Sequence, residues 1–174
     1  MNRRNALQTL AAVAVLPWLS ACSRAAGTAS NAGGSNVTPL KKAADAWRDE
    51  VSPAAYRVLF EDATEPAFSS PLDKEKRAGI YICAACYLPL FDSAHKFDSG
   101  TGWPSFTQPI AGHVATKWDF KLIWPRTEYH CARCGGHQGH VFDDGPPPRG
   151  QRWCNNGVAL KFVPKDATLP ALRS

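Results

Sequence analysis

Short stretches with strand-like residues lie in the middle and C-terminal parts of the chain. Val158–Val163 has the alternation of a strand, Gly79–Cys83 contains two isoleucines and a tyrosine and leads into Cys83, and Glu128–Cys131 leads into Cys131 in the same way. Each pattern predicts a strand. Gly145–Gly150 holds three consecutive prolines between glycines and predicts a loop.

Helical patterns occur only near the start of the predicted domain. Lys41–Val51 predicts a short helix. Ser52 and Pro53 then supply an N-cap and a first-turn proline for a second helix over Ala54–Phe60. We therefore expect one mainly β domain with short helices at its N-terminal end.

The first residues, 1–22, have the pattern of an export signal. Arg3 and Arg4 precede Ala6–Ala21, which is uncharged, mostly apolar and short for a membrane span. The final Leu-Ser-Ala-Cys resembles a bacterial lipoprotein signal, cleaved before Cys22, whose sulfur then receives lipid. An ordinary cleaved signal or an anchor without lipid remains the alternative.

The segment that follows is typical of a flexible tether. Residues 23–38 are rich in Ala, Gly, Ser and Asn and have no hydrophobic period. We expect the folded domain to span 39–174. Export and lipidation at Cys22 would place it on the periplasmic side of a bacterial membrane.

Composition narrows the class of protein further. The 174 residues are 44% hydrophobic and 20% charged, as in a soluble globular domain. The 20 Lys and Arg exceed the 15 Asp and Glu by five but form no basic run, so we expect no nucleic-acid partner. We expect a monomer.

Five of the six cysteines follow the export segment. Cys83 and Cys86 form one Cys-x-x-Cys pair, and Cys131 and Cys134 form another. Two such pairs suit one tetrahedral zinc ion, which is structural because four thiolates leave no open position. Since an oxidising compartment also favours disulfides, paired bridges remain the alternative.

Cys154 has no partner and is a candidate nucleophile. Arg152 lies two positions earlier, on the same face of a strand, where its charge would favour the thiolate. Asn155 and Asn156 offer hydrogen-bond donors nearby. A small buried hydrophobic residue is the plainer interpretation of such a cysteine.

His137 and His140 could deliver a proton to a reacting oxygen, or simply make structural hydrogen bonds. Trp103 and Phe106 lie in a segment rich in glycine and proline. That context favours a shaped loop walling an apolar pocket, although an aromatic residue of this kind is more often part of a core.

Together these motifs resemble the B-type methionine sulfoxide reductases, and the likeness runs from about Trp47 to Pro164. The order and spacing of the motifs agree with that family. The matching segments are Tyr81–Cys86, Lys96–Phe106, Arg126–Asp144 and Arg152–Pro164.

The resemblance implies a fold of two antiparallel sheets, a structural zinc ion and a defined reaction. Cys154 would attack the sulfur of methionine-R-sulfoxide in an oxidised protein or peptide and become a sulfenic acid. His137 and His140 would protonate the sulfoxide oxygen, directly or through water. Trp103 would hold the substrate methyl group.

The remaining family roles fall on three residues close to these. Phe142 would lie beside Trp103, Asn156 would hydrogen-bond near the catalytic sulfur, and Arg152 would favour the thiolate. The reductant would be a thioredoxin-like thiol.

Departures from the family pattern alter the expected chemistry. Thr101 stands where many members carry a recycling cysteine, so we expect an external thiol to reduce the sulfenic acid directly. Ala115–Pro125 matches the family poorly, and Gly157 replaces a common serine.

Two rival functions use the same residues differently. One is a zinc-stabilised binding module in which Cys154 is inert. The other is a thiol–disulfide oxidoreductase that uses the Cys-x-x-Cys pairs.

Overall fold

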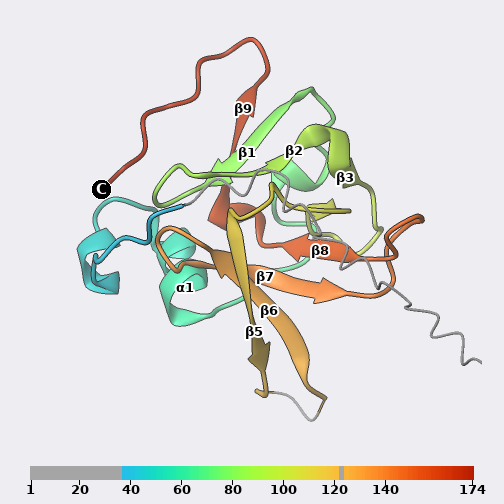
Figure 1. The fold of residues 1–174 in the computed structure, drawn as a ribbon, viewed down its shortest axis with the longest axis horizontal. Coiled ribbons are helices and arrows are strands. Elements are labelled where there is room, and N and C mark those ends of the chain that lie inside the picture. Colours follow the sequence, from blue (N-terminus) through green and yellow to red (C-terminus); the bar gives the residue numbers. More distant parts are fainter. Residues whose placement is uncertain (1–36, 122–123) are drawn as a thin grey trace, which may run out of the picture. The chain divides into compact units, whose positions relative to one another are not determined.

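The computed structural model describes residues 37–121 and 124–174, and the predicted export signal, with Cys22, lies outside them. Two antiparallel sheets form the domain (Figure 1). The smaller sheet has the order β2-β1-β9: Pro89–Asp92, Gly79–Cys83 and Leu160–Pro164. The larger has the order β3-β4-β8-β7-β6-β5: Lys96–Phe97, Ser105–Phe106, Arg152–Asn155, His137–Phe142, Arg126–Cys131 and Val114–Asp119.

Short helical elements connect and flank the strands. No described helix has the length and apolar character needed to cross a membrane. The elements are η1 (Ala44–Trp47), α1 (Pro53–Glu61), η2 (Pro71–Asp73), η3 (Ser93–His95) and η4 (Gly157–Ala159). The predicted fold class, mainly β with two antiparallel sheets and short N-terminal helices, is confirmed.

The second predicted helix is confirmed and the first is wrong in kind and length. In α1 the Ser52 hydroxyl accepts a hydrogen bond from the Ala55 amide at 3.2 Å, as an N-cap does. Over Lys41–Val51 only the 3₁₀ turn η1 forms. The N-cap residue of η1 is Ala43, whose methyl side chain cannot accept a hydrogen bond from the free backbone amides of the first turn. A longer helix would therefore have an uncapped N-terminus.

The predicted strands at Gly79–Cys83 and Glu128–Cys131 are confirmed, and the predicted loop at Gly145–Gly150 lies between β7 and β8. The last strand begins later than predicted. The Glu65 carboxylate accepts hydrogen bonds from the amides of Gly157 and Val158, at 2.6 and 2.9 Å. Those amides are therefore unavailable to a strand, and the chain turns through η4 first.

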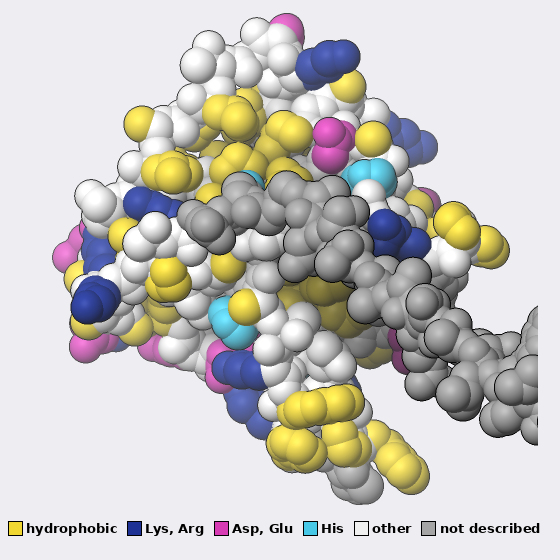
Figure 2. All heavy atoms as spheres, in the orientation of Figure 1, with side chains coloured by type: hydrophobic (Ala, Val, Ile, Leu, Met, Phe, Trp, Pro, Cys, Tyr) yellow, Lys and Arg dark blue, Asp and Glu magenta, His cyan; other side chains and the backbone are white. Residues whose placement is uncertain are grey.

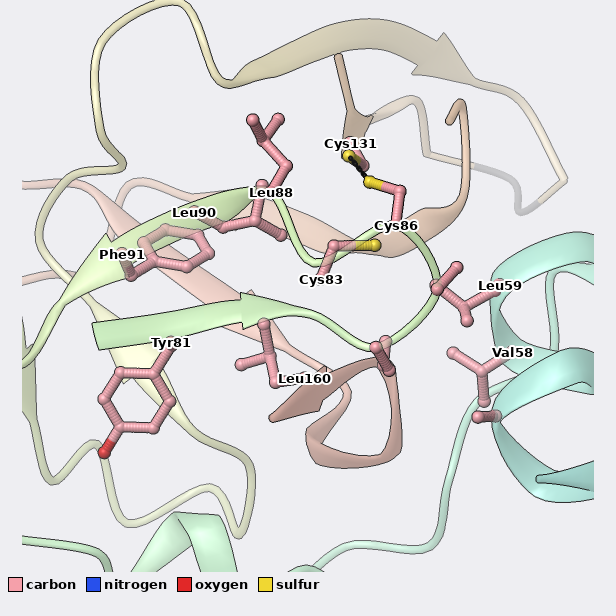
Figure 3. Close-up of a cluster of buried hydrophobic side chains, with 14 of the residues drawn as sticks. Val58, Leu59, Tyr81, Cys83, Cys86, Leu88, Leu90, Phe91, Cys131 and Leu160 are labelled. Carbon is pink, nitrogen blue, oxygen red and sulfur yellow. Dashed lines mark hydrogen bonds between the residues drawn. The ribbon is translucent and has the colours of Figure 1, made fainter. Parts of the chain in front are cut away.

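Aromatic side chains form the centre of the core between the sheets. The rings of Phe91 and Phe106 stack with centroids 4.2 Å apart, and Tyr81 meets Phe106 edge-on at 4.9 Å. Figure 3 shows Tyr81 of β1 close to side chains from the two strands that flank β1. These are Leu90 and Phe91 of β2 and Leu160 of β9. Phe106 therefore belongs to the core, as the plainer interpretation of its motif expected.

Gly157, which replaces a serine common in the family, has no room for a side chain. A Cβ atom there would lie 1.9 Å from the Ser70 hydroxyl oxygen and 2.4 Å from the Ser70 Cβ. The Ser70 side chain therefore occupies the space that a side chain at position 157 would need.

This contact predicts that Gly157→Ala lowers the free energy of unfolding by about 1–3 kcal/mol, the usual cost of overpacking. Urea unfolding of Gly157→Ala, Ser70→Gly and the double variant measures it. On the Ser70→Gly background the added alanine should cost much less, because the clashing atoms are gone. Equal costs on both backgrounds would show that Ser70 is not the obstacle.

Candidate active site and four-cysteine cluster

Four cysteines from two distant segments meet at the junction of the sheets. Sγ of Cys83 lies 3.6 Å from Sγ of Cys134, and Sγ of Cys86 lies 3.5 Å from that of Cys131. All four sulfurs lie within 4.8 Å of one another, and Figure 3 shows three of them converging. A tetrahedral ion with zinc–sulfur bonds of about 2.3 Å places its ligand sulfurs roughly 3.8 Å apart, so the set fits such an ion.

The cluster joins the two sheets through their strand ends. Cys83 ends β1 of the smaller sheet, and Cys131 ends β6 of the larger. The sulfur separations are far longer than a disulfide bond of about 2.05 Å. These four cysteines are therefore arranged as ligands of one metal ion, which would tie the sheets together.

Cys154 and His140 are direct neighbours across two strands. Cys154 on β8 pairs with His140 on β7, which pairs in turn with Glu128 on β6. Cys154 also pairs with Ser105 on β4. Because paired residues of antiparallel strands project to the same side, these four side chains share one face of the sheet.

A β-bulge brings His137 to that face as well. Two strand residues three positions apart ordinarily point to opposite faces. The register between β6 and β7 shifts between Tyr129 and His130, so that His130 pairs with His137. The extra residue reverses the alternation, and the rings of His137 and His140 lie with centroids 5.4 Å apart.

A small pocket opens on this face. Its volume is about 140 Å³. Five of the predicted site residues line it: Trp103, His140, Phe142, Cys154 and Asn156. The other two, His137 and Arg152, are buried close by rather than in its lining.

Burial and charge act in opposite directions on the nucleophile. Burial raises the pKa of the Cys154 thiol, and the positive charge of Arg152 opposes that rise. The hydrogen-bonding groups of Arg152, Thr101 and Ser105 beside the sulfur also lower this pKa, but burial outweighs them. Arg152 is held by Asp144, which accepts two hydrogen bonds at 2.8 and 2.9 Å.

Asp119 positions His140. Nε2 of His140 lies 2.8 Å from Oδ2 of Asp119, so this nitrogen carries the hydrogen. The same oxygen accepts a hydrogen bond from Arg126 at 2.6 Å. Burial lowers the pKa of His140, and the hydrogen bond to Asp119 opposes that change. The ring is therefore oriented by a buried carboxylate and is mainly neutral near pH 7.

His137 has a carboxylate neighbour too. Its Nδ1 lies 2.9 Å from Oε1 of Glu128, and Lys117 lies 3.2 Å from that oxygen. Asp62 completes a possible group of three metal ligands, but Lys121 already pairs with it at 2.7 Å. The lysines therefore pair with both acids, so this group is arranged as ion pairs beside the histidine rather than as an open metal site.

Asn156 and Trp103 are fixed by backbone partners. The Asn156 side chain accepts a hydrogen bond from the Glu65 amide and donates one to the Gln138 carbonyl, each at 3.0 Å. The indole N–H of Trp103 donates to the Glu65 carbonyl at 3.2 Å. These hydrogen bonds fix the positions of both side chains in the pocket wall.

Three acidic residues around this site were missed by sequence reasoning: Glu65, Asp119 and Glu128. Glu65 is 92 residues from Gly157, and Asp119 is 21 residues from His140. No local pattern marks contacts of that range. Had residues 115–119 and 126–131 been predicted as the two strands of a hairpin, Asp119 and Glu128 would have been expected on the same face as the histidines.

The chain is similar to characterised sequences over most of its described length. Residues 51–164 match the model of the SelR domain. A Bradyrhizobium diazoefficiens protein named peptide methionine sulfoxide reductase MsrB is 53% identical over 125 residues, covering 71% of this chain and 90% of that protein.

Two further proteins of the same name extend this likeness. The Thiobacillus denitrificans protein is 51% identical over 121 residues, which is 69% of this chain and 92% of that one. The Leptospira interrogans protein is 47% identical over 124 residues, which is 71% of this chain and 95% of that one. The chain therefore belongs to the SelR domain family, the B-type methionine sulfoxide reductases that its motifs resemble.

Proposed function

We propose that this protein reduces methionine-R-sulfoxide in oxidised proteins or peptides to methionine. The observation that carries the proposal is the direct pairing of Cys154 with His140, both lining one small pocket with Trp103. A soft nucleophile, a proton carrier and an apolar wall are what sulfoxide reduction needs.

The reaction transfers the sulfoxide oxygen to Cys154. The sulfur of Cys154 attacks the sulfoxide sulfur, and the sulfoxide oxygen takes up the proton that the thiol has lost, with His140 as carrier and His137 beside it. The oxygen then moves to the Cys154 sulfur as its bond to the substrate sulfur breaks, the transient sulfur–sulfur bond breaks as well, and methionine leaves while Cys154 carries the oxygen as a sulfenic acid. The substrate sulfur is reduced by two electrons and Cys154 is oxidised by two.

The roles of the other pocket residues follow from their contacts. Trp103 and Phe142 supply the apolar wall for the substrate methyl group. Arg152 stacks over the Phe142 ring at 4.3 Å and stabilises the Cys154 thiolate by charge. Asn156 keeps the pocket wall next to the sulfur in place.

An external thiol is proposed to complete the cycle. Thr101 hydrogen-bonds to Cys154 where a recycling cysteine stands in many relatives. The other cysteines of the described residues belong to the four-cysteine cluster. A thioredoxin-like protein would therefore reduce the sulfenic acid, with two thiols yielding one disulfide and water.

One structural zinc ion per chain is the proposed occupant of the cysteine cluster. Thiolate ligands and a closed tetrahedron are typical of structural zinc. Cys83, Cys86, Cys131 and Cys134 would hold it, and the ion would strengthen the junction of the sheets without taking part in the reaction.

Export and lipidation at Cys22 are proposed from residues 1–22 alone, with 23–38 as tether and 39–174 as the catalytic domain. They would place a monomeric enzyme on the periplasmic side of a bacterial membrane. A binding module with an inert Cys154 is less favoured, because it gives no reason for Cys154, His140 and Trp103 to meet in one pocket.

Cys154→Ser should reduce turnover of a methionine-R-sulfoxide peptide by at least about 10³-fold, because a hydroxyl is a far weaker nucleophile toward sulfur. Zinc content and thermal midpoint should stay at their wild-type values. Activity within tenfold of wild type would refute the proposed mechanism.

One turnover without reductant should add a single oxygen to the wild-type chain, as a sulfenic acid on Cys154. Intact-mass analysis with zinc retained, with and without a sulfenic-acid trapping reagent, measures this. A disulfide that includes Cys154 would contradict direct recycling by an external thiol.

Thr101→Val should shift the rising limb of the pH profile of kcat/KM to higher pH. The thiolate is the attacking form, and the threonine hydrogen bond lowers the pKa of Cys154, so its loss leaves less thiolate near neutrality. A hydrogen bond to a charged group contributes about 1.5–3 kcal/mol, so kcat/KM at pH 7 should fall by roughly 10- to 100-fold. An equal loss at every pH would mean that Thr101 acts otherwise.

Cys86→Ser should lower the zinc content from about one ion per chain and lower the thermal midpoint substantially, since structural zinc contributes directly to folding. Elemental analysis and calorimetry test this, with Cys154→Ser as the matched control. Unchanged zinc and stability would exclude the proposed metal site.

A further inference from the structure

Exposed aromatic side chains gather at the tip of the hairpin formed by β5 and β6. Trp118, Phe120 and Trp124, hereafter the aromatic tip, are 68%, 71% and 80% exposed. Hydrophobic side chains are visible at this tip, at the bottom of Figure 2. Large aromatic residues are ordinarily buried, so a group of them in solvent indicates a binding surface.

The aromatic tip adjoins the active-site pocket. Asp119 stands between Trp118 and Phe120, and its carboxylate contacts His140 in the pocket wall. Arg126, close after Trp124, also lines the pocket. Trp124 precedes the pocket-lining Arg126 by two residues, and because neighbouring Cα atoms are about 3.8 Å apart, the aromatic tip comes within about 8 Å of the pocket wall along the backbone.

A hollow with aromatic and charged walls lies beside the hairpin. It has a volume of about 400 Å³, and its lining combines Trp118 and Phe120 with the charged residues Asp62, Lys117, Asp119, Lys121 and Glu128. Asp62 follows the last residue of α1 and pairs with Lys121 at 2.7 Å. This ion pair connects the hairpin to the end of the helix.

The size of the pocket requires a second surface for a polypeptide substrate. A volume of about 140 Å³ accommodates one side chain, so the rest of the substrate must lie across the rim. Methionine is usually buried among apolar neighbours, and its oxidation disrupts such packing. The residues beside an accessible methionine sulfoxide are therefore often apolar and unfolded.

Charge on the hairpin favours this occupant over a membrane. An anionic lipid surface attracts unpaired basic residues. Each described Lys or Arg of the hairpin instead has an acidic partner. The pairs are Lys117 with Glu128, Lys121 with Asp62, and Arg126 with Asp119.

We propose that the aromatic tip binds apolar residues flanking methionine sulfoxide in unfolded polypeptides. It would give this enzyme a preference for oxidised segments of unfolded proteins over oxidised methionine in polar, flexible regions. The inference rests on the proposed reductase function and adds the class of substrate to it.

The test compares three substrates that each carry one methionine-R-sulfoxide. They are the amino acid blocked at both ends, a fifteen-residue peptide with Leu and Phe around the sulfoxide, and the same peptide with Ser and Gly there. The variant carries Trp118→Ser, Phe120→Ser and Trp124→Ser. A control carries Leu169→Ser and Leu172→Ser, which change exposed leucines in the C-terminal segment.

We expect the wild type to prefer the apolar peptide by about tenfold in kcat/KM, mainly through KM, because partial burial of a flanking apolar side chain against the aromatic tip strengthens binding of that peptide. The tip variant should lose this preference, keep its rate on the blocked amino acid, and remain folded. The leucine control should behave as the wild type does.

Other outcomes overturn the inference. A tip variant that keeps the peptide preference would exclude the aromatic tip as its source. A wild type that shows no preference between the two peptides would also exclude the inference. In that case, binding of the tip to vesicles of phosphatidylcholine and phosphatidylglycerol would identify a membrane as its partner, and association of two chains through the tip would identify a second copy. If the wild type reduces none of the three substrates, the proposed function itself fails, which separates the two results.

Discussion

The junction that the four cysteines make between the sheets is the constraint on which the rest of the structure depends. Cys131 and Cys134 form the turn between β6 and β7, so the cluster sets where β7 begins. The bulge follows at once and turns His137 to the face that carries His140. The side-chain amide of Gln138 donates to Cys83 at 3.7 Å, which connects the bulge to the cluster directly.

The active site depends on this register because its parts come from neighbouring strands. Cys154, His140 and Glu128 form one cross-strand row, and a slip by one residue would turn each away from its partner. Gly139 permits β7 and β8 to approach, since a Cβ there would lie 1.9 Å from the Cys154 carbonyl oxygen. Cys131 of the four-cysteine cluster and the catalytic residues thus lie on strands of the same sheet.

A balance of burial and charge makes the nucleophile usable. An apolar pocket suits the substrate methyl group, but the same burial raises the pKa of the Cys154 thiol. Arg152 and the hydroxyls of Thr101 and Ser105 offset part of this cost. Thr101 is therefore among the groups that lower the pKa of the nucleophile.

Sequence reasoning predicted those parts of the fold and site that short motifs encode. The cysteine spacing predicted the cluster, Ser52-Pro53 predicted α1, and the family motifs predicted a pocket with Cys154, His140 and Trp103. It failed where long-range contacts decide the outcome. Glu65 takes the amides at Gly157 and Val158 from the last strand, and the bulge depends on the pairing of β6 with β7.

The most direct test of the central claim is a chiral assay with both sulfur epimers of one methionine sulfoxide peptide. Each epimer is supplied separately with a dithiol reductant, and methionine formation is followed by chromatography. If Cys154, His140 and Trp103 form the proposed site, the R epimer is converted and the S epimer remains. Conversion of the S epimer, or of neither, would contradict the account.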